Sequence, residues 1–164
     1  MTKMETRSHA KPGRAQRGVY AIEFAFVFLI IFALLYAVIC YGFLLTMRMS
    51  LQNAAEDGAR AGLRYQKNLS DRKTEAYDVA VKRTNWLPTG LKENRNVEAA
   101  ICLTGEDTCS QVEPPCGLEW NDRCQMTVTV AVSGIETLFP AFPSFAMPGR
   151  ITGKASILLD GRSL

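Results

Sequence analysis

A single carboxylate, Glu23, lies at the start of the most apolar stretch of the chain, within "QRGVYAIEFAFVFLII". Gly18 stands five residues before it. Proteolytic cleavage after Gly18 would give Val19 a new α-amino group, which is mostly cationic at neutral pH. Because Val19 and Glu23 are four residues apart, a helix would place this amine one turn from the carboxylate. The chemistry indicated by this spacing is an ion pair created by cleavage, within one chain or between neighbouring chains.

The glutamate is followed by 22 residues without a charge, from Phe24 to Leu45. As a helix this run would be about 33 Å long, close to the roughly 30 Å hydrocarbon core of a bilayer. Glu23 would then lie about one turn inside the cytoplasmic end, where its reach to the headgroups offers a simpler interpretation of its presence. A cleaved secretory signal is disfavoured, since its apolar region would be shorter and would precede its small cleavage-site residue.

Basic residues are concentrated before the apolar run. Residues 1–18 hold five basic residues and one acidic residue, a net +4, so the remainder of the chain carries −1 of the total +3. The positive-inside rule keeps the N-terminus in the cytoplasm and sends the C-terminal part outward. Because the basicity belongs to this leader, the charge does not indicate binding to nucleic acid. The partner indicated by this part of the chain is the lipid bilayer.

Four cysteines occur in the part predicted to be exported, and an even set in a small exported domain is typical of disulfides. Zinc is the rival interpretation, but the cysteine gaps lack the paired spacing of structural zinc sites, and the chain's one histidine, His9, lies in the leader. The strand ending at the first cysteine and the strand beginning at the fourth are expected to be antiparallel neighbours. This favours the nested one of three possible pairings, Cys102–Cys124 with Cys109–Cys116.

Residue types suited to catalysis are scarce beyond the leader. Since no histidine follows His9, neither a Ser-His-Asp nor a Cys-His arrangement is available. Glu113, Glu119 and Asp122 are acidic neighbours in a cysteine-rich loop, where such charges usually serve solubility. We therefore predict no catalytic residues, no metal and no cofactor, and an exported enzyme is the least favoured class.

A helix is predicted from Val19 to Tyr65, continuing beyond the apolar run. Its last turns carry small residues on one face: Ala54, Gly58, Ala61 and Gly62. Such a stripe permits close approach between helices. The alternative is that the two glycines mark a fraying helix end, since glycine costs about 1 kcal/mol relative to alanine in a helix.

The remainder of the chain predicts one further helix and three strands. Ser70 is the expected N-cap of the helix, and Pro88 ends it. Apolar and polar residues then alternate over 97–103, 124–132 and 150–160, which predicts three half-buried antiparallel strands. The fold class is thus α+β. The residues expected to share the buried face are Val97, Ala99, Ile101, Leu103, Met126, Val128, Val130, Val132, Ile151, Ala155, Ile157 and Leu159.

Prolines alternate with phenylalanines before the last strand, in "IETLFPAFPSFAMPG". The prolines exclude a regular helix or a central strand. Phe139, Phe142 and Phe145 are expected to tuck their rings over the sheet. The alternative is an apolar surface for a partner or for the lipid interface.

Four segments follow from these patterns. Residues 1–18 form the basic leader, 19–46 a transmembrane helix, 47–65 its extension, and 66–164 an exported α+β domain of about three strands and one further helix.

The residues around the glutamate also carry a resemblance. "RG" followed by "VYAIEF" resembles a type IV prepilin processing site, and "LQNAAEDGARAG" resembles the TadE-like pseudopilins of tight-adherence (Flp) pilus systems. The specific part of the resemblance covers residues 14–62. It implies that Gly18 is the scissile residue, that Val19 is the new N-terminus, and that Glu23 with the aromatic Phe24 serves assembly.

The resemblance further implies an inner-membrane protein with a periplasmic C-terminal domain, whose partners are a prepilin peptidase, a pilus assembly platform and other pilins or pseudopilins. Because the major pilins of these systems are very short, it implies a minor component that supports assembly of the fibre. The alternative is an uncleaved, signal-anchored envelope protein whose exported domain binds a partner or a ligand. An intact N-terminus at Met1 would favour that alternative.

Overall fold

The computed structural model describes residues 17–64, 66, 68–105, 109, 114–117, 119, 122–139 and 146–159, without the side chains of residues 17–19. The chain divides into two compact units, Met1–Tyr41 and Gly42–Leu164. We refer to the second unit as the head. It includes the C-terminal turns of the first helix, which the sequence pattern assigned to a separate extension.

The first helix, α1, spans Arg17–Ala61. It begins two residues before the predicted start and ends four residues before the predicted end, where Gly62 begins a turn. Among the described residues, α1 is the one helix that is long and apolar enough to cross a membrane. Its side chains from Tyr20 to Leu35 are all exposed, as expected for a surface that faces lipid.

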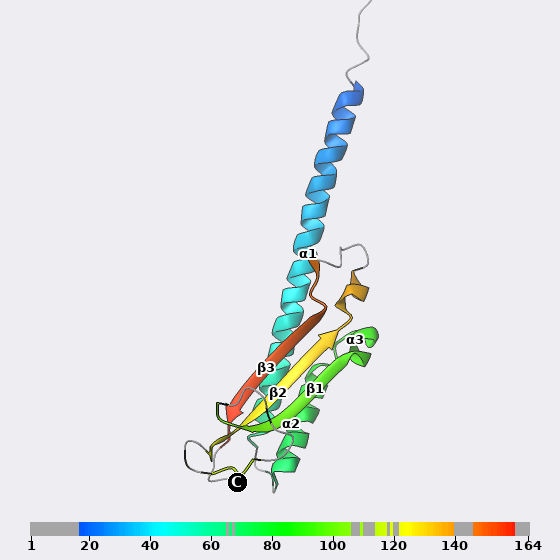
Figure 1. Ribbon diagram of the computed structural model, residues 1–164. Coiled ribbons are helices and arrows are strands. Elements are labelled where there is room, and N and C mark those ends of the chain that lie inside the picture. Colours follow the sequence, from blue (N-terminus) through cyan, green and yellow to red (C-terminus); the bar gives the residue numbers. More distant parts are fainter. Residues whose placement is uncertain are drawn as a thin grey trace, which may run out of the picture. The chain divides into compact units, whose positions relative to one another are not determined.

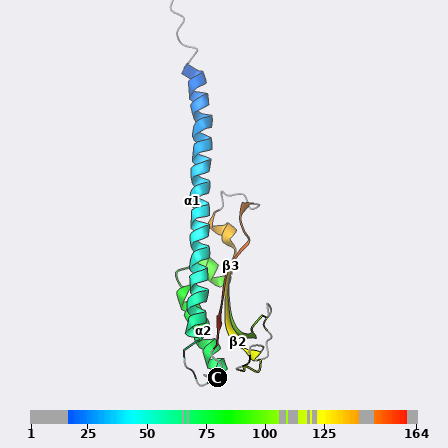
Figure 2. The ribbon, with the colours of Figure 1, turned by 90° about the vertical axis from the view of Figure 1, so that its left-hand side faces the viewer.

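The head is α+β with a three-stranded antiparallel sheet, as predicted, and the strand order is β1-β2-β3 (Figure 1). The C-terminal turns of α1 and all of α2 lie on one face of this sheet, which Figure 2 shows edge-on. The elements after α1 are α2 (Leu69–Arg83), α3 (Thr89–Glu93), β1 (Arg95–Leu103), β2 (Cys124–Ser133), η2 (Ile135–Leu138) and β3 (Arg150–Leu158).

Two local predictions about the second helix are wrong. The N-cap of α2 is Asn68, whose backbone is extended (φ −133°, ψ 155°), and Ser70 lies inside the first turn. The helix ends at Arg83, five residues before Pro88. Pro88 instead precedes α3, an unpredicted single turn, where its fixed φ suits a helix start.

The strand register confirms the predicted buried face. Met126 of β2 is paired with Ile101 of β1 and with Ile157 of β3, so the apolar residues of all three strands point to one side. That side packs on Met47, Leu51, Ala55 and Ala59 of α1 and on Ala76 and Ala80 of α2, and these residues form one hydrophobic core.

Helix α1 lies unusually close to the edge strand β3. A β-carbon added to Gly153 would come within 2.6 Å of the Leu51 carbonyl group. Next to this contact, the Gln52 amide donates to the Lys154 carbonyl oxygen (2.9 Å) and accepts from the Lys154 N–H (3.1 Å). The glycine therefore allows helix and strand backbones to meet, and the glutamine satisfies the main-chain groups at that point of the edge.

Candidate functional site

The candidate processing site lies at the beginning of α1. Since the helix begins at Arg17, the bond between Gly18 and Val19 belongs to its first turn. Glu23 lies in the same helix with an exposed side chain. The helical spacing between Val19 and Glu23 that the pairing hypothesis requires is therefore present in the backbone. The leader, residues 1–16, lies outside the described residues.

An aromatic ladder follows the glutamate, and sequence reasoning missed it. Phe24 stacks on Phe28 with ring centroids 6.0 Å apart, and Phe28 stacks on Phe32 at 6.1 Å. All three rings are exposed. Their i,i+4 spacing is visible in the sequence and could have revealed the ladder. The rings form one continuous ridge, and Phe24, expected to act in assembly, is its first member.

The stripe of small residues lies inside the head. A β-carbon at Gly58 would come within 2.8 Å of the Ala76 carbonyl oxygen and 3.0 Å of the Ala80 side chain, both in α2. A β-carbon at Gly62 would come within 2.9 Å of Met126 on β2. Ala54 and Ala61 are buried as well. The small residues thus bring α1 against α2 and the sheet of the same chain.

An ion pair accompanies this helix contact. The Arg83 Nε atom lies 2.8 Å from the Asp57 Oδ2 atom, next to Gly58 in sequence. Arg83 interrupts the apolar side of α2, and its pairing with α1 explains why a charge is found there. Because the side chains are 63% and 35% exposed, the pair contributes about 1 kcal/mol at most to stability. Its main effect is to orient the two helices.

The four cysteines of the head form disulfides as predicted, but the predicted nested pairing is wrong. The bridges are sequential, Cys102–Cys109 and Cys116–Cys124. The strands of Cys102 and Cys124 are antiparallel neighbours, yet the register pairs Leu103 with Cys124. Cys102 and Cys124 therefore point to opposite faces of the sheet, because adjacent residues of a strand alternate in direction.

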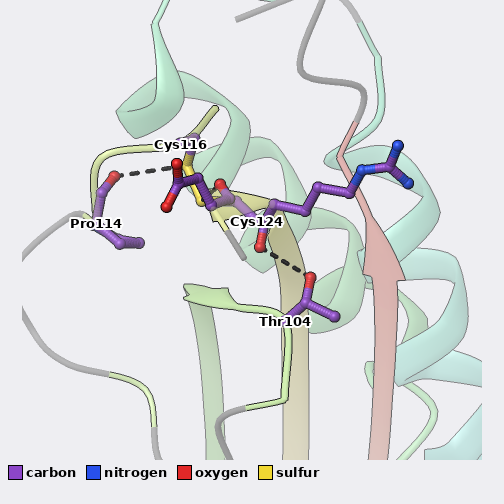
Figure 3. Close-up of a disulfide and its surroundings, with 6 residues drawn as sticks. Thr104, Pro114, Cys116 and Cys124 are labelled. Carbon is purple, nitrogen blue, oxygen red and sulfur yellow. Dashed lines mark hydrogen bonds between the residues drawn. A yellow bond between two sulfur atoms is a disulfide. The ribbon is translucent and has the colours of Figure 1, made fainter. Parts of the chain in front are cut away.

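The two bridges fasten the long connection between β1 and β2 at both ends. Near the Cys116–Cys124 bridge, the Thr104 hydroxyl and N–H both donate to the Arg123 carbonyl oxygen at 2.8 Å (Figure 3). The Sγ atom of Cys116 lies 3.5 Å from the Pro114 carbonyl oxygen. These contacts close the end of the sheet with covalent and main-chain bonds, which is a structural role.

The acidic loop residues and the phenylalanines are described only in part. Glu119 and Asp122 are exposed, and Glu113 lies outside the described residues. No group of three or more potential metal ligands occurs in the part of the chain that the structure describes. Phe139 packs against the core of the head, whereas Phe142 and Phe145 lie outside the described residues.

Among the described residues, the protein combines one exposed apolar helix, long enough to cross a membrane, with a small disulfide-bonded α+β head, and this combination suggests a single-pass membrane anchor. A family model described as TadE-like protein matches residues 18–60, which is α1 from Gly18 to one residue before its end. Over this part of α1 the chain is similar to TadE-like proteins. No curated protein and no solved structure matches the chain.

Proposed function

We propose that this protein is a minor pseudopilin that is cleaved after Gly18 and supports assembly of a Flp/Tad-type pilus used for adherence or secretion. The proposal rests on one observation above all, the position of Glu23. This carboxylate lies within α1, directly before its charge-free and exposed run, in the segment that matches the TadE-like family. A protein that only needed a membrane anchor would avoid the cost of a charge at this place.

Cleavage supplies the partner for the carboxylate. Removal of the leader exposes the Val19 α-amino group, which is mostly cationic at neutral pH. The helix holds this group one turn from Glu23, so the two charges offset each other near the membrane surface. The α-amino group of a neighbouring subunit can pair with Glu23 in the same way. Cleavage would thereby allow helices of neighbouring subunits to pack side by side.

The aromatic ladder provides the surface for that packing. Association of helices in lipid depends on van der Waals contact and on polar pairs, since lipid removes the hydrophobic driving force. Phe24, Phe28 and Phe32 present a continuous ridge immediately beyond the glutamate. The ion pair would fix the depth of one helix against the next, and the ridge would supply area of contact.

The proposed setting follows from the charge bias and the family. The leader stays in the cytoplasm, where a prepilin peptidase cuts it, α1 crosses the inner membrane, and the head lies in the periplasm. The partners are the pilus assembly platform and other pilins or pseudopilins. The protein acts by assembly and has no catalytic chemistry of its own.

The test separates cleavage from assembly by replacing Glu23 with glutamine, which is similar in size but uncharged. The Glu23→Gln chain is expected to begin at Val19, as the wild type does, when its intact mass is measured. Its assembly should fail, because a loss of about 1.4 kcal/mol at each contact already lowers association about tenfold. Surface pili would be counted by electron microscopy.

Two matched variants complete this test. Ile22→Ala changes an exposed neighbour of Glu23 and is expected to leave both cleavage and pili intact. Gly18→Ala is expected to leave a full-length precursor. A wild-type chain that still begins at Met1 would overturn the proposal in favour of a signal-anchored binding protein. Normal pili in the Glu23→Gln variant would show that assembly does not require the ion pair.

A further inference from the structure

One end of the head meets α1 through aromatic rings. Phe139 follows η2, and its ring packs edge-on against Phe43 of α1, with centroids 5.7 Å apart and planes at 72°. Both Phe139 and Leu138 are half-buried against the core of the head. Figure 1 shows η2 at the end of the sheet where β2 ends and β3 begins, which is the end opposite to the disulfides.

Phe43 belongs to the charge-free run that is expected to cross the bilayer. A hydrocarbon core of about 30 Å takes about 20 helical residues, so a crossing that starts at Phe24 ends near Phe43. The first charge after the run is Arg48, an exposed side chain whose long stem suits the headgroup region. Phe43 therefore marks the outer boundary of the hydrocarbon, and a ring packed against it lies at nearly the same depth.

The surface around this contact is apolar and open. Phe43 is 43% exposed although Phe139 covers one side of it. Aromatic rings are favoured at the membrane–water interface, where the apolar face is buried and the edge is close to water. At the contact between Phe43 and Phe139 the apolar surface of α1 thus continues onto the head.

We infer that this end of the head, formed by Phe43, Leu138 and Phe139, is seated in the outer interface of the lipid bilayer. The occupant of the surface is lipid, because the patch continues a helix face that must itself be in lipid. The consequence is a second attachment of the head to the membrane, in addition to the helix. Such an attachment sets the height at which the head is presented to other subunits.

The inference requires that α1 crosses a bilayer, but neither cleavage after Gly18 nor pilus assembly. It can therefore be tested on the full-length chain in lipid nanodiscs that hold one copy each. The reporter is Phe139→Trp, in a background in which Trp86 and Trp120 are replaced by phenylalanine. The probe is a set of phospholipids that carry bromine, a contact quencher of tryptophan, at shallow or deep positions of the acyl chain.

The expected result is strong quenching of the Phe139→Trp emission, greater with shallow than with deep bromines. The matched control is Leu158→Trp, which is 46% exposed at the opposite end of β3 and should not be quenched. Leu138→Trp provides a second reporter if the first disturbs packing, and retention of both disulfides reports folding. Quenching at residues 138 and 139 no stronger than at 158 would overturn the inference, and emission that changes only with two copies per disc would assign the patch to a second chain.

Discussion

The two parts of helix α1, one exposed and one packed inside the head, differ in the size of their side chains. Between Tyr20 and Leu35 every side chain is exposed, and Phe24 is 70% accessible, whereas Leu51 in the head is 0% accessible. The first part is rich in large apolar residues, and the second in alanine and glycine. Large side chains satisfy a lipid surface without any precise partner. Small ones are needed where another backbone comes close, as α2 does at Gly58.

The largest effect is expected at Gly153, where the backbones of α1 and β3 meet. Gly153→Ala is expected to lower the free energy of unfolding of the head by about 3 kcal/mol, because main-chain atoms cannot move aside for the new methyl group. Chemical unfolding of the full chain in detergent would measure the loss. Gly42→Ala in α1 is the control and should be neutral or slightly stabilising, because no atom of the described residues lies within 4 Å of the added β-carbon.

Both disulfides lie in the head, so their removal should leave the exposed part of α1 unaffected. Each bridge closes a short loop, with sequence separations of 7 and 8. The double variant Cys116→Ser, Cys124→Ser should lower the stability of the head by about 2–3 kcal/mol and leave the helicity of residues 20–39 unchanged. Unfolding in detergent measures the first effect and circular dichroism the second. Mass mapping of unreduced peptides should recover Cys102 linked to Cys109, and recovery of a Cys102–Cys124 peptide would contradict the structure.

The smallest effect is expected at the ion pair between α1 and α2. Arg83→Ala should cost about 1 kcal/mol or less, because both charges are partly solvated. The double variant with Asp57→Asn should cost little more than either change alone, which a double-mutant cycle in detergent would show. A loss as large as that of a disulfide would mean that the pair does more than orient the helices.

Much of the fold could be predicted from the sequence because its patterns are local. The charge-free run predicted the helix, and the two-residue alternation predicted three strands with the correct buried face. The pairing of the cysteines could not be predicted in this way. The pairing depends on the register between β1 and β2, in which Cys124 lies opposite Leu103 and not opposite Cys102. A shift of one residue would place Cys102 and Cys124 on the same face of the sheet.

Other features were visible in the sequence but were not interpreted. The phenylalanines at 24, 28 and 32 have helical spacing, and a glycine inside a strand, as at 153, often marks a close backbone approach. The Asn68 N-cap was missed because asparagine and serine are about equally good caps, and both stand near the helix start. For the processing residues, by contrast, sequence and family provide the whole argument, and the helical spacing of Val19 and Glu23 is consistent with it.

The two hydrogen bonds between the Gln52 side chain and the Lys154 main chain limit how another molecule can pair with the sheet. An exposed sheet edge is a ready template on which a strand from another molecule can be added. At the centre of β3 this edge is already occupied. The Lys154 N–H and carbonyl oxygen are hydrogen-bonded to the Gln52 side chain, and the α1 backbone lies against Gly153. The first helix thus blocks the addition of a foreign strand at this part of the β3 edge.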